Sequence, residues 1–96
     1  MKVAVSARAK ADALNAFSYL FDLNPAAADR ALERIERKIE QLQAFPFVGV
    51  ARPRLAPDVR VAVVGTYLIL YKVETEAVIV LRIIDGRMDV DKEFRR

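Results

Sequence analysis

The stretch from Val59 to Ile84 limits the possible folds of this chain more than any other part of the sequence, because it contains three strand-like segments in succession. The first segment has the period of two expected of a strand with one buried face, with Val59, Val61 and Val63 on one side and Arg60, Ala62 and Val64 on the other. Gly65-Thr66 separates it from Tyr67–Val73, and Glu74-Thr75-Glu76 separates that segment from Ala77–Ile84. Connections this short join only antiparallel neighbours, so the stretch predicts an antiparallel meander that ends at Asp85-Gly86.

Two helices are predicted before the meander. Lys2–Val5 has the alternation of a short first strand, and Ser6 after it is a good N-cap for a helix from Ala7 to about Leu23. Asn24-Pro25 ends this helix and begins the next, because asparagine caps a helix and proline fits its first position. The second helix extends from Pro25 to about Ala44, and the single break between the two predicts an antiparallel helical hairpin.

The elements follow in the order β-α-α-β-β-β, which predicts an α+β domain with the helical hairpin packed on a small antiparallel sheet. A length of 96 residues corresponds to a single domain over residues 1–96, and 54% hydrophobic with 30% charged residues is typical of a folded globule. After the last strand, residues 87–96 are expected to form a charged, frayed tail.

The composition excludes several kinds of site. The chain has no cysteine and no histidine, so it lacks the commonest metal ligands and the commonest general base, and we predict no metal, no cofactor and no catalytic residue. The net charge of +3 is modest and more typical of solubility than of a nucleic-acid footprint, so direct nucleic-acid binding is left open. The longest uncharged runs, such as residues 61–71, are shorter than the ~18 residues of a membrane span, and early charges leave no signal-peptide core, so we expect a cytoplasmic protein without membrane contact.

Arg60 and Arg82 stand out because each lies within an otherwise apolar strand. On the predicted alternation, Arg82 shares a face with Val80 and Ile84. Each arginine has two possible roles. In a structural role, it pairs with an acid such as Asp58 or Asp89 or lies on a solvated sheet face. In a functional role, it contacts a target. By contrast, Tyr67 and Tyr71 share a face of the middle strand with Ile69 and Val73, and we expect both tyrosines in the core.

Four segments, in order and over the full length, carry a resemblance to a known family: Asn24-Pro25-x-Ala27-Ala28, Phe45-Pro46-x-x-Gly49, Tyr67–Tyr71, and Val78 to Asp89. In these segments the chain resembles the ParE branch of the RelE/ParE superfamily, the toxins of type II toxin–antitoxin modules. It departs from the family pattern where Asp85 replaces the usual histidine of the turn and Met88 replaces a basic residue.

The resemblance implies a non-enzymatic toxin that poisons DNA gyrase, serves plasmid stabilization and is neutralised by a ParD-like antitoxin in a hetero-oligomer. With the strand arginines, it makes the following residues candidates for target contact: Arg60, Arg82, Arg87, Asp89, Arg95 and Arg96. The antitoxin is expected to lay an amphipathic segment over the hairpin, beside apolar residues that spread around more than one face of the first helix: Phe17, Tyr19, Phe21 and Leu23.

Two alternatives stay open. The first is a RelE-like, ribosome-dependent mRNA endonuclease with Arg60, Arg82 and Arg87 around a phosphate. No tyrosine or histidine follows Tyr71, so proton transfer would fall to carboxylates such as Asp89 or Asp91. The second is an inactive member that only binds the antitoxin.

Overall fold

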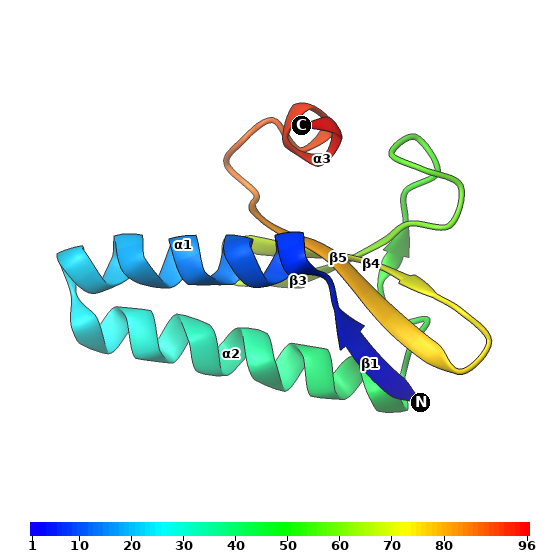
Figure 1. The fold of residues 1–96 in the computed structure, drawn as a ribbon, viewed down its shortest axis with the longest axis horizontal. Coiled ribbons are helices and arrows are strands. Elements are labelled where there is room, and N and C mark those ends of the chain that lie inside the picture. The colour runs from blue at the N-terminus through cyan, green and yellow to red at the C-terminus, as the bar shows by residue number, and fades with distance from the viewer.

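In the computed structural model, which describes all 96 residues, a five-stranded sheet carries two long helices on one face and a short helix on the other (Figure 1). The elements in chain order are β1 (Lys2–Val5), α1 (Ala7–Leu23), α2 (Pro25–Ala44), β2 (Val50–Ala51), β3 (Arg60–Val64), β4 (Tyr67–Val73), β5 (Ala77–Asp85) and α3 (Val90–Arg95). The α+β class and the predicted β-α-α-β-β-β order are confirmed, with β2 and α3 as additions. None of the three helices is long and apolar enough to cross a membrane.

The hairpin helices begin and end at the predicted residues because their caps are local. The Ser6 hydroxyl accepts a hydrogen bond from the Ala9 amide at 3.0 Å. The Asn24 side chain accepts from the amides of Ala26 and Ala27 at 3.1 and 3.3 Å, which satisfies donors that the first turn of α2 leaves free. Figure 1 shows that the α1–α2 hairpin extends past the end of the sheet, so the tip of the hairpin overhangs it.

The sheet has the order β1-β5-β4-β3-β2. The strands β2 to β5 pair antiparallel, as the meander predicted, but β1 pairs parallel with β5, so the sheet is mixed and the prediction of a purely antiparallel sheet is wrong at β1. The physical reason is that most of the chain separates β1 from β5, and only short links force neighbours to run antiparallel.

Both faces of the central strands are buried, whereas the alternation had predicted one buried face. The hairpin covers a cluster that includes Ile35, Leu42, Ile69, Tyr71 and Val80, and the predicted core position of Tyr71 is confirmed by its complete burial. The opposite face carries a second, smaller cluster, to which α3 and the loop before β3 contribute: Val59, Val61, Leu70 and Ile84, with Leu55, Val90 and Phe94 packed against it.

A bulge in β5 changes which residues share a face. Leu70 pairs with Arg82 and Tyr71 pairs with Val80, which leaves Leu81 without a partner on β4. The extra residue shifts the alternation, so Val80 lies on the hairpin face while Ile84 lies in the cluster on the α3 face. The predicted common face for Arg82, Val80 and Ile84 is therefore wrong.

The predicted frayed tail is also wrong, because most of it forms α3. The Asp89 carboxylate caps this helix by accepting the Lys92 amide at 3.2 Å. Val90 and Phe94, one helical turn apart, both pack against the second cluster. The apolar pair supplies the burial that a tail of charged residues would lack.

Candidate functional site

The buried Arg82 joins three elements. Its Nε and Nη2 atoms donate to the Asp12 carboxylate at 2.7 and 3.0 Å, and Nη1 donates to the Glu93 carbonyl of α3. Asp12 also accepts the Ile83 amide at 3.0 Å. This part of β5 lies past the last residue that pairs with β1. The pKa of Arg82 is raised, mainly because of its hydrogen bond to Asp12. With 8% of its surface exposed and these partners in place, Arg82 has the structural role.

The partner of Arg82 is Asp12, and neither Asp58 nor Asp89 as the sequence had suggested. Asp12 belongs to α1, 70 positions away, and the only sign of its role is that it is the single acid in the first three turns of an Ala-rich helix. A pairing over this sequence separation cannot be inferred from helical or strand periodicity.

Arg60 is half-buried and ties the start of β3 to the loop after α2. Its Nη1 atom donates to the carbonyls of Gly49 and Phe47 at 2.7 and 3.2 Å. Its guanidinium carbon lies 5.0 Å from the centroid of the Phe47 ring, a cation–π distance. Arg60 therefore supports a loop that carries several exposed apolar side chains: Phe45, Phe47, Val48 and Val50.

Tyr71 of β4 also holds the loop after α2 in place. Its hydroxyl donates to the Pro46 carbonyl at 2.8 Å and accepts the Gly49 amide at 2.9 Å. A Cβ atom at Gly49 would lie 2.5 Å from this hydroxyl oxygen, so only glycine allows the approach. The Pro46-x-x-Gly49 exit of α2 is thus one half of a buried contact whose other half is Tyr71.

Asp85, which departs from the family pattern, forms an ion pair with Arg87. The Arg87 Nη2 and Nε atoms lie 2.6 and 3.0 Å from the two carboxylate oxygens of Asp85, which also accepts the Arg87 amide at 2.9 Å. The hydrogen bond to Arg87 lowers the pKa of Asp85 and raises that of Arg87. Burial, and then the charge of Asp85, raise the pKa of the neighbouring Tyr67. The Arg87 side chain stays exposed, but its charge is balanced within the turn.

The other target candidates lie on or beside α3. Asp89 is its N-cap, Arg95 donates to the Arg54 carbonyl at 3.2 Å, and Arg96 pairs with Glu93 at 3.1 Å. Arg8 at the start of α1 donates to the Arg96 carbonyl. We call the group of four arginines that these contacts bring together the C-terminal basic surface: Arg8, Arg54, Arg95 and Arg96. Arg8 could not be recognised from the sequence, because it is 88 positions from its partner.

The six target candidates do not form one site. Arg60 pairs with Tyr71 across the sheet, whereas Asp85, two positions before Arg87, pairs with Tyr67. Arg60 and the turn of Arg87 therefore lie beside β4 residues that are four positions apart, about 13 Å along the strand at the usual rise. Arg82 is buried between them, and Arg95 and Arg96 lie at the end of α3.

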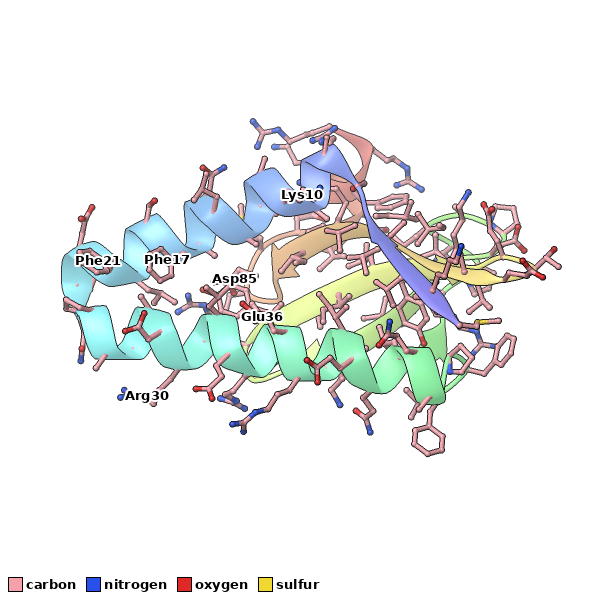
Figure 2. All side chains as sticks on the ribbon, turned by 60° about the horizontal axis from the view of Figure 1, so that its bottom comes forward. Lys10, Phe17, Phe21, Arg30, Glu36 and Asp85 are labelled. Atoms are coloured by element: carbon pink, nitrogen blue, oxygen red, sulfur yellow. The ribbon has the colours of Figure 1, made fainter.

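The four antitoxin candidates all lie in the second half of α1, towards the tip of the hairpin. Tyr19, Phe21 and Leu23 are 62%, 48% and 68% exposed, and Phe17 is half-buried. The rings of Phe17 and Phe21 lie side by side with centroids 5.7 Å apart (Figure 2). Leu14, which is 65% exposed, extends this group towards the middle of the helix. We call these five residues the α1 apolar surface.

Three comparisons place the chain among known proteins. Residues 3–90 match the family described as ParE toxin of type II toxin-antitoxin system, parDE. Toxin ParE3 of Caulobacter vibrioides is 41% identical over 63 residues, which are 66% of this chain and 63% of that protein, so the match spans less than two thirds of this relative. A solved structure of the chromosomal ParDE TA system from P. aeruginosa superposes with a TM-score of 0.77, at 24% identity, over 88% of this chain and 95% of the matched chain, and confirms the predicted fold.

Proposed function

Because this chain belongs to the ParE toxin family of type II toxin–antitoxin systems, we propose that it is the toxin of such a module and is held inactive by a ParD-like antitoxin. The observation that carries this proposal is the family match over residues 3–90, and the α1 apolar surface adds a place for the antitoxin. Large apolar side chains gathered on one exposed helix are unusual in a monomer and typical of a docking surface. An amphipathic segment of the antitoxin that wraps around α1 would bury them, because they spread around more than one face of the helix.

Charge insertion in the α1 apolar surface tests the antitoxin proposal. The double variant Tyr19→Glu/Phe21→Glu is expected to weaken binding of the antitoxin encoded beside this protein about 100-fold or more. The reason is that the complex would then bury a glutamate carboxylate at each of the two positions. Phe45→Glu is the matched control, since Phe45 is 63% exposed but lies at the other end of the hairpin. Titration calorimetry gives both affinities, and wild-type affinity in the double variant would contradict this docking site.

The proposed target is DNA gyrase in the cytoplasm, poisoned by binding rather than by catalysis. The C-terminal basic surface is the best-formed group of arginines for this contact, because Arg82 is buried, Arg87 is balanced by Asp85, and only Arg96 among the four members of the surface forms an ion pair. In a supercoiling assay with detergent and protease treatment, the protein is expected to make linear DNA accumulate. Arg95→Ala/Arg96→Ala is expected to reduce this accumulation severalfold, while Arg37→Ala, an exposed arginine of α2, is the control.

Absence of linear DNA would contradict the gyrase proposal and shift attention to the two alternatives. The geometry gives little support to a ribonuclease that uses Arg60, Arg82 and Arg87 together, since these side chains do not converge. Primer extension on translated messages would still detect such cleavage directly. The Asp85–Arg87 pair favours the other alternative, a weakened or inactive member, and a growth assay after induction measures it.

A further inference from the structure

The C-terminal basic surface is held together by contacts between its own members. Arg8 in the first turn of α1 donates to the carbonyl of Arg96, and Arg95 donates to the carbonyl of Arg54 in the loop between β2 and β3. Because Arg95 and Arg96 are neighbours in the sequence, the two contacts connect three segments that are far apart along the chain. All four side chains are exposed. The fold therefore presents four arginines from three parts of the chain on one outer surface.

Most of the charge on this surface is not neutralised within the chain. Arg96 pairs with Glu93 at 3.1 Å, whereas the other three arginines take part in no ion pair. The only other acid of α3 is Asp91, and the exposed Lys92 beside it offsets its charge. A guanidinium group has five N–H donors, and the two arginines that contact a carbonyl here use one donor each. Most of the donors are therefore free to bind an anion.

The surface has no apolar centre. Val90 and Phe94, the apolar side chains of α3, pack against the second cluster of the sheet. None of the large hydrophobic side chains that are exposed in this protein lies in α3, in residues 7–10 or in residues 52–58. Interfaces between proteins depend on well-packed apolar or aromatic anchors at their centre, and charged residues are depleted there. The C-terminal basic surface therefore matches a highly charged partner better than a second protein surface.

The shape of the surface indicates an extended anion. None of its four arginines lines any of the larger hollows of the molecule, whereas sites for small ligands are concave. Duplex DNA carries one negative charge per ~1.7 Å of its axis and can contact several separate cations at once. Single strands are bound by stacking their bases on aromatic side chains, and the only aromatic residue of α3, Phe94, packs against the sheet. These features favour a duplex.

We propose that the C-terminal basic surface binds the phosphate backbone of duplex DNA. Guanidinium groups bind phosphate oxygens in a bidentate way, and contacts to the backbone carry no information about the bases, so this binding is independent of DNA sequence. When the toxin acts on gyrase, the surface contacts the DNA segment that the enzyme holds. This last step rests on the proposed function, whereas binding to free DNA does not.

The salt dependence of DNA binding tests the inference. The purified toxin is titrated into a fluorescent duplex of about 20 base pairs between about 50 and about 200 mM salt, and anisotropy gives Kd. Each phosphate contact contributes a slope of about 0.9 to the plot of log Kd against log salt, so four arginines predict a slope between about three and four. Arg95→Ala/Arg96→Ala is expected to lower this slope by about 1.8 and to raise Kd at least about tenfold at the lowest salt concentration.

Two further variants separate the charge of this surface from other effects. Arg95→Lys/Arg96→Lys keeps both charges and is expected to bind DNA within about threefold of wild type, because the salt-dependent contact is made by charge. The matched control is Arg30→Ala/Arg37→Ala, which removes two exposed arginines of α2 and is expected to retain the wild-type slope. Unchanged circular dichroism establishes that each variant is folded.

The outcomes separate this inference from the proposed function. Absence of duplex binding by the wild type at the lowest salt concentration, or an equal loss in both alanine variants, would overturn the inference, and so would tighter binding to a single strand of the same length. If linear DNA accumulates with gyrase although the toxin has no affinity for free duplex, the gyrase proposal stands and the DNA contact is rejected. DNA affinity that depends on Arg95 and Arg96 without any linear DNA supports the DNA contact and rejects gyrase as the target.

Discussion

At the residue scale, the Asp12–Arg82 pair connects α1, β5 and α3 through one buried charge. Asp12→Ala is expected to destabilise the protein by about 3–5 kcal/mol, because it leaves Arg82 buried without its counter-charge and the Ile83 amide without its acceptor. Urea denaturation measures the loss. Asp22→Ala, which removes an exposed acid of the same helix that forms no ion pair, is expected to cost less than about 0.5 kcal/mol. Equal effects of the two variants would show that the pair adds nothing to stability.

The Asp85–Arg87 pair makes a second prediction, about pH. The pKa of Asp85 in the folded protein is lowered from 3.8 by Arg87, so the pair stabilises the folded state above that value. This stability is lost as the pH falls through the lowered pKa. The gap in unfolding free energy between wild type and Asp85→Asn should be constant near neutral pH and shrink below 3.8. Asp91→Asn, at an exposed position of α3, provides the comparison, and a gap that grows in acid would contradict the assignment.

At the element scale, the loop after α2 is held by the contact between Tyr71 and Gly49. Gly49→Ala is expected to cost about 1–3 kcal/mol, because the new Cβ would overlap the tyrosine hydroxyl, and also the tyrosine ring and the Val61 carbonyl, both of which Tyr71→Phe leaves in place. Tyr71→Phe removes that hydroxyl and also both of its hydrogen bonds. The double variant should therefore be more stable than the sum of the single effects implies, and thermal unfolding of the four proteins measures this coupling. Strict additivity would contradict the proposed contact.

The docking of α3 gives a prediction at the same scale. Phe94→Ala removes half of the apolar pair that holds this helix on the sheet, and a loss of about 2 kcal/mol is expected for a half-buried phenylalanine. Hydrogen exchange of the α3 amides should accelerate more than that of the hairpin, because a helix of six residues is not stable alone. Met88→Ala, outside the cluster and 49% exposed, serves as the control. Slow exchange in α3 of the Phe94 variant would mean that other contacts hold the helix.

At the scale of the whole molecule, the overhang of the hairpin is the feature most relevant to partners (Figure 1). The radius of gyration of 12.8 Å is close to the ~12.5 Å expected of a compact domain of this length, so the overhang is a local extension of a well-packed body. It exposes the α1 apolar surface.

We therefore expect the overhang to change most when the antitoxin binds. In the free protein, amides of residues 18–24 at the tip of α1 should exchange faster than those of residues 32–39 in the middle of α2, which pack on the core cluster. Antitoxin should slow exchange at the tip by at least about tenfold. Residues 59–64 on the far side of the sheet give the internal reference. Protection confined to α3 would place the antitoxin elsewhere.

The sequence alone determined the elements of this protein. Strand alternation, the Ser6 and Asn24 caps and the short turns act between residues a few positions apart, so β1, α1, α2 and the meander could be predicted with nearly correct ends. The Pro46-x-x-Gly49 exit and the turn around Asp85-Gly86 were recognisable as motifs for the same reason. Of the site residues, the apolar character of Phe17, Tyr19, Phe21 and Leu23 was visible along the helix.

The tertiary structure alone decided how these elements meet. The parallel pairing of β1, the bulge at Leu81 and the docking of α3 depend on contacts between distant segments. The Asp12–Arg82 pair and the gathering of arginines into the C-terminal basic surface depend on them as well. Local periodicity fixes which way a side chain faces relative to its own element, but the free energy of burying or pairing a charge depends on what the fold brings against it.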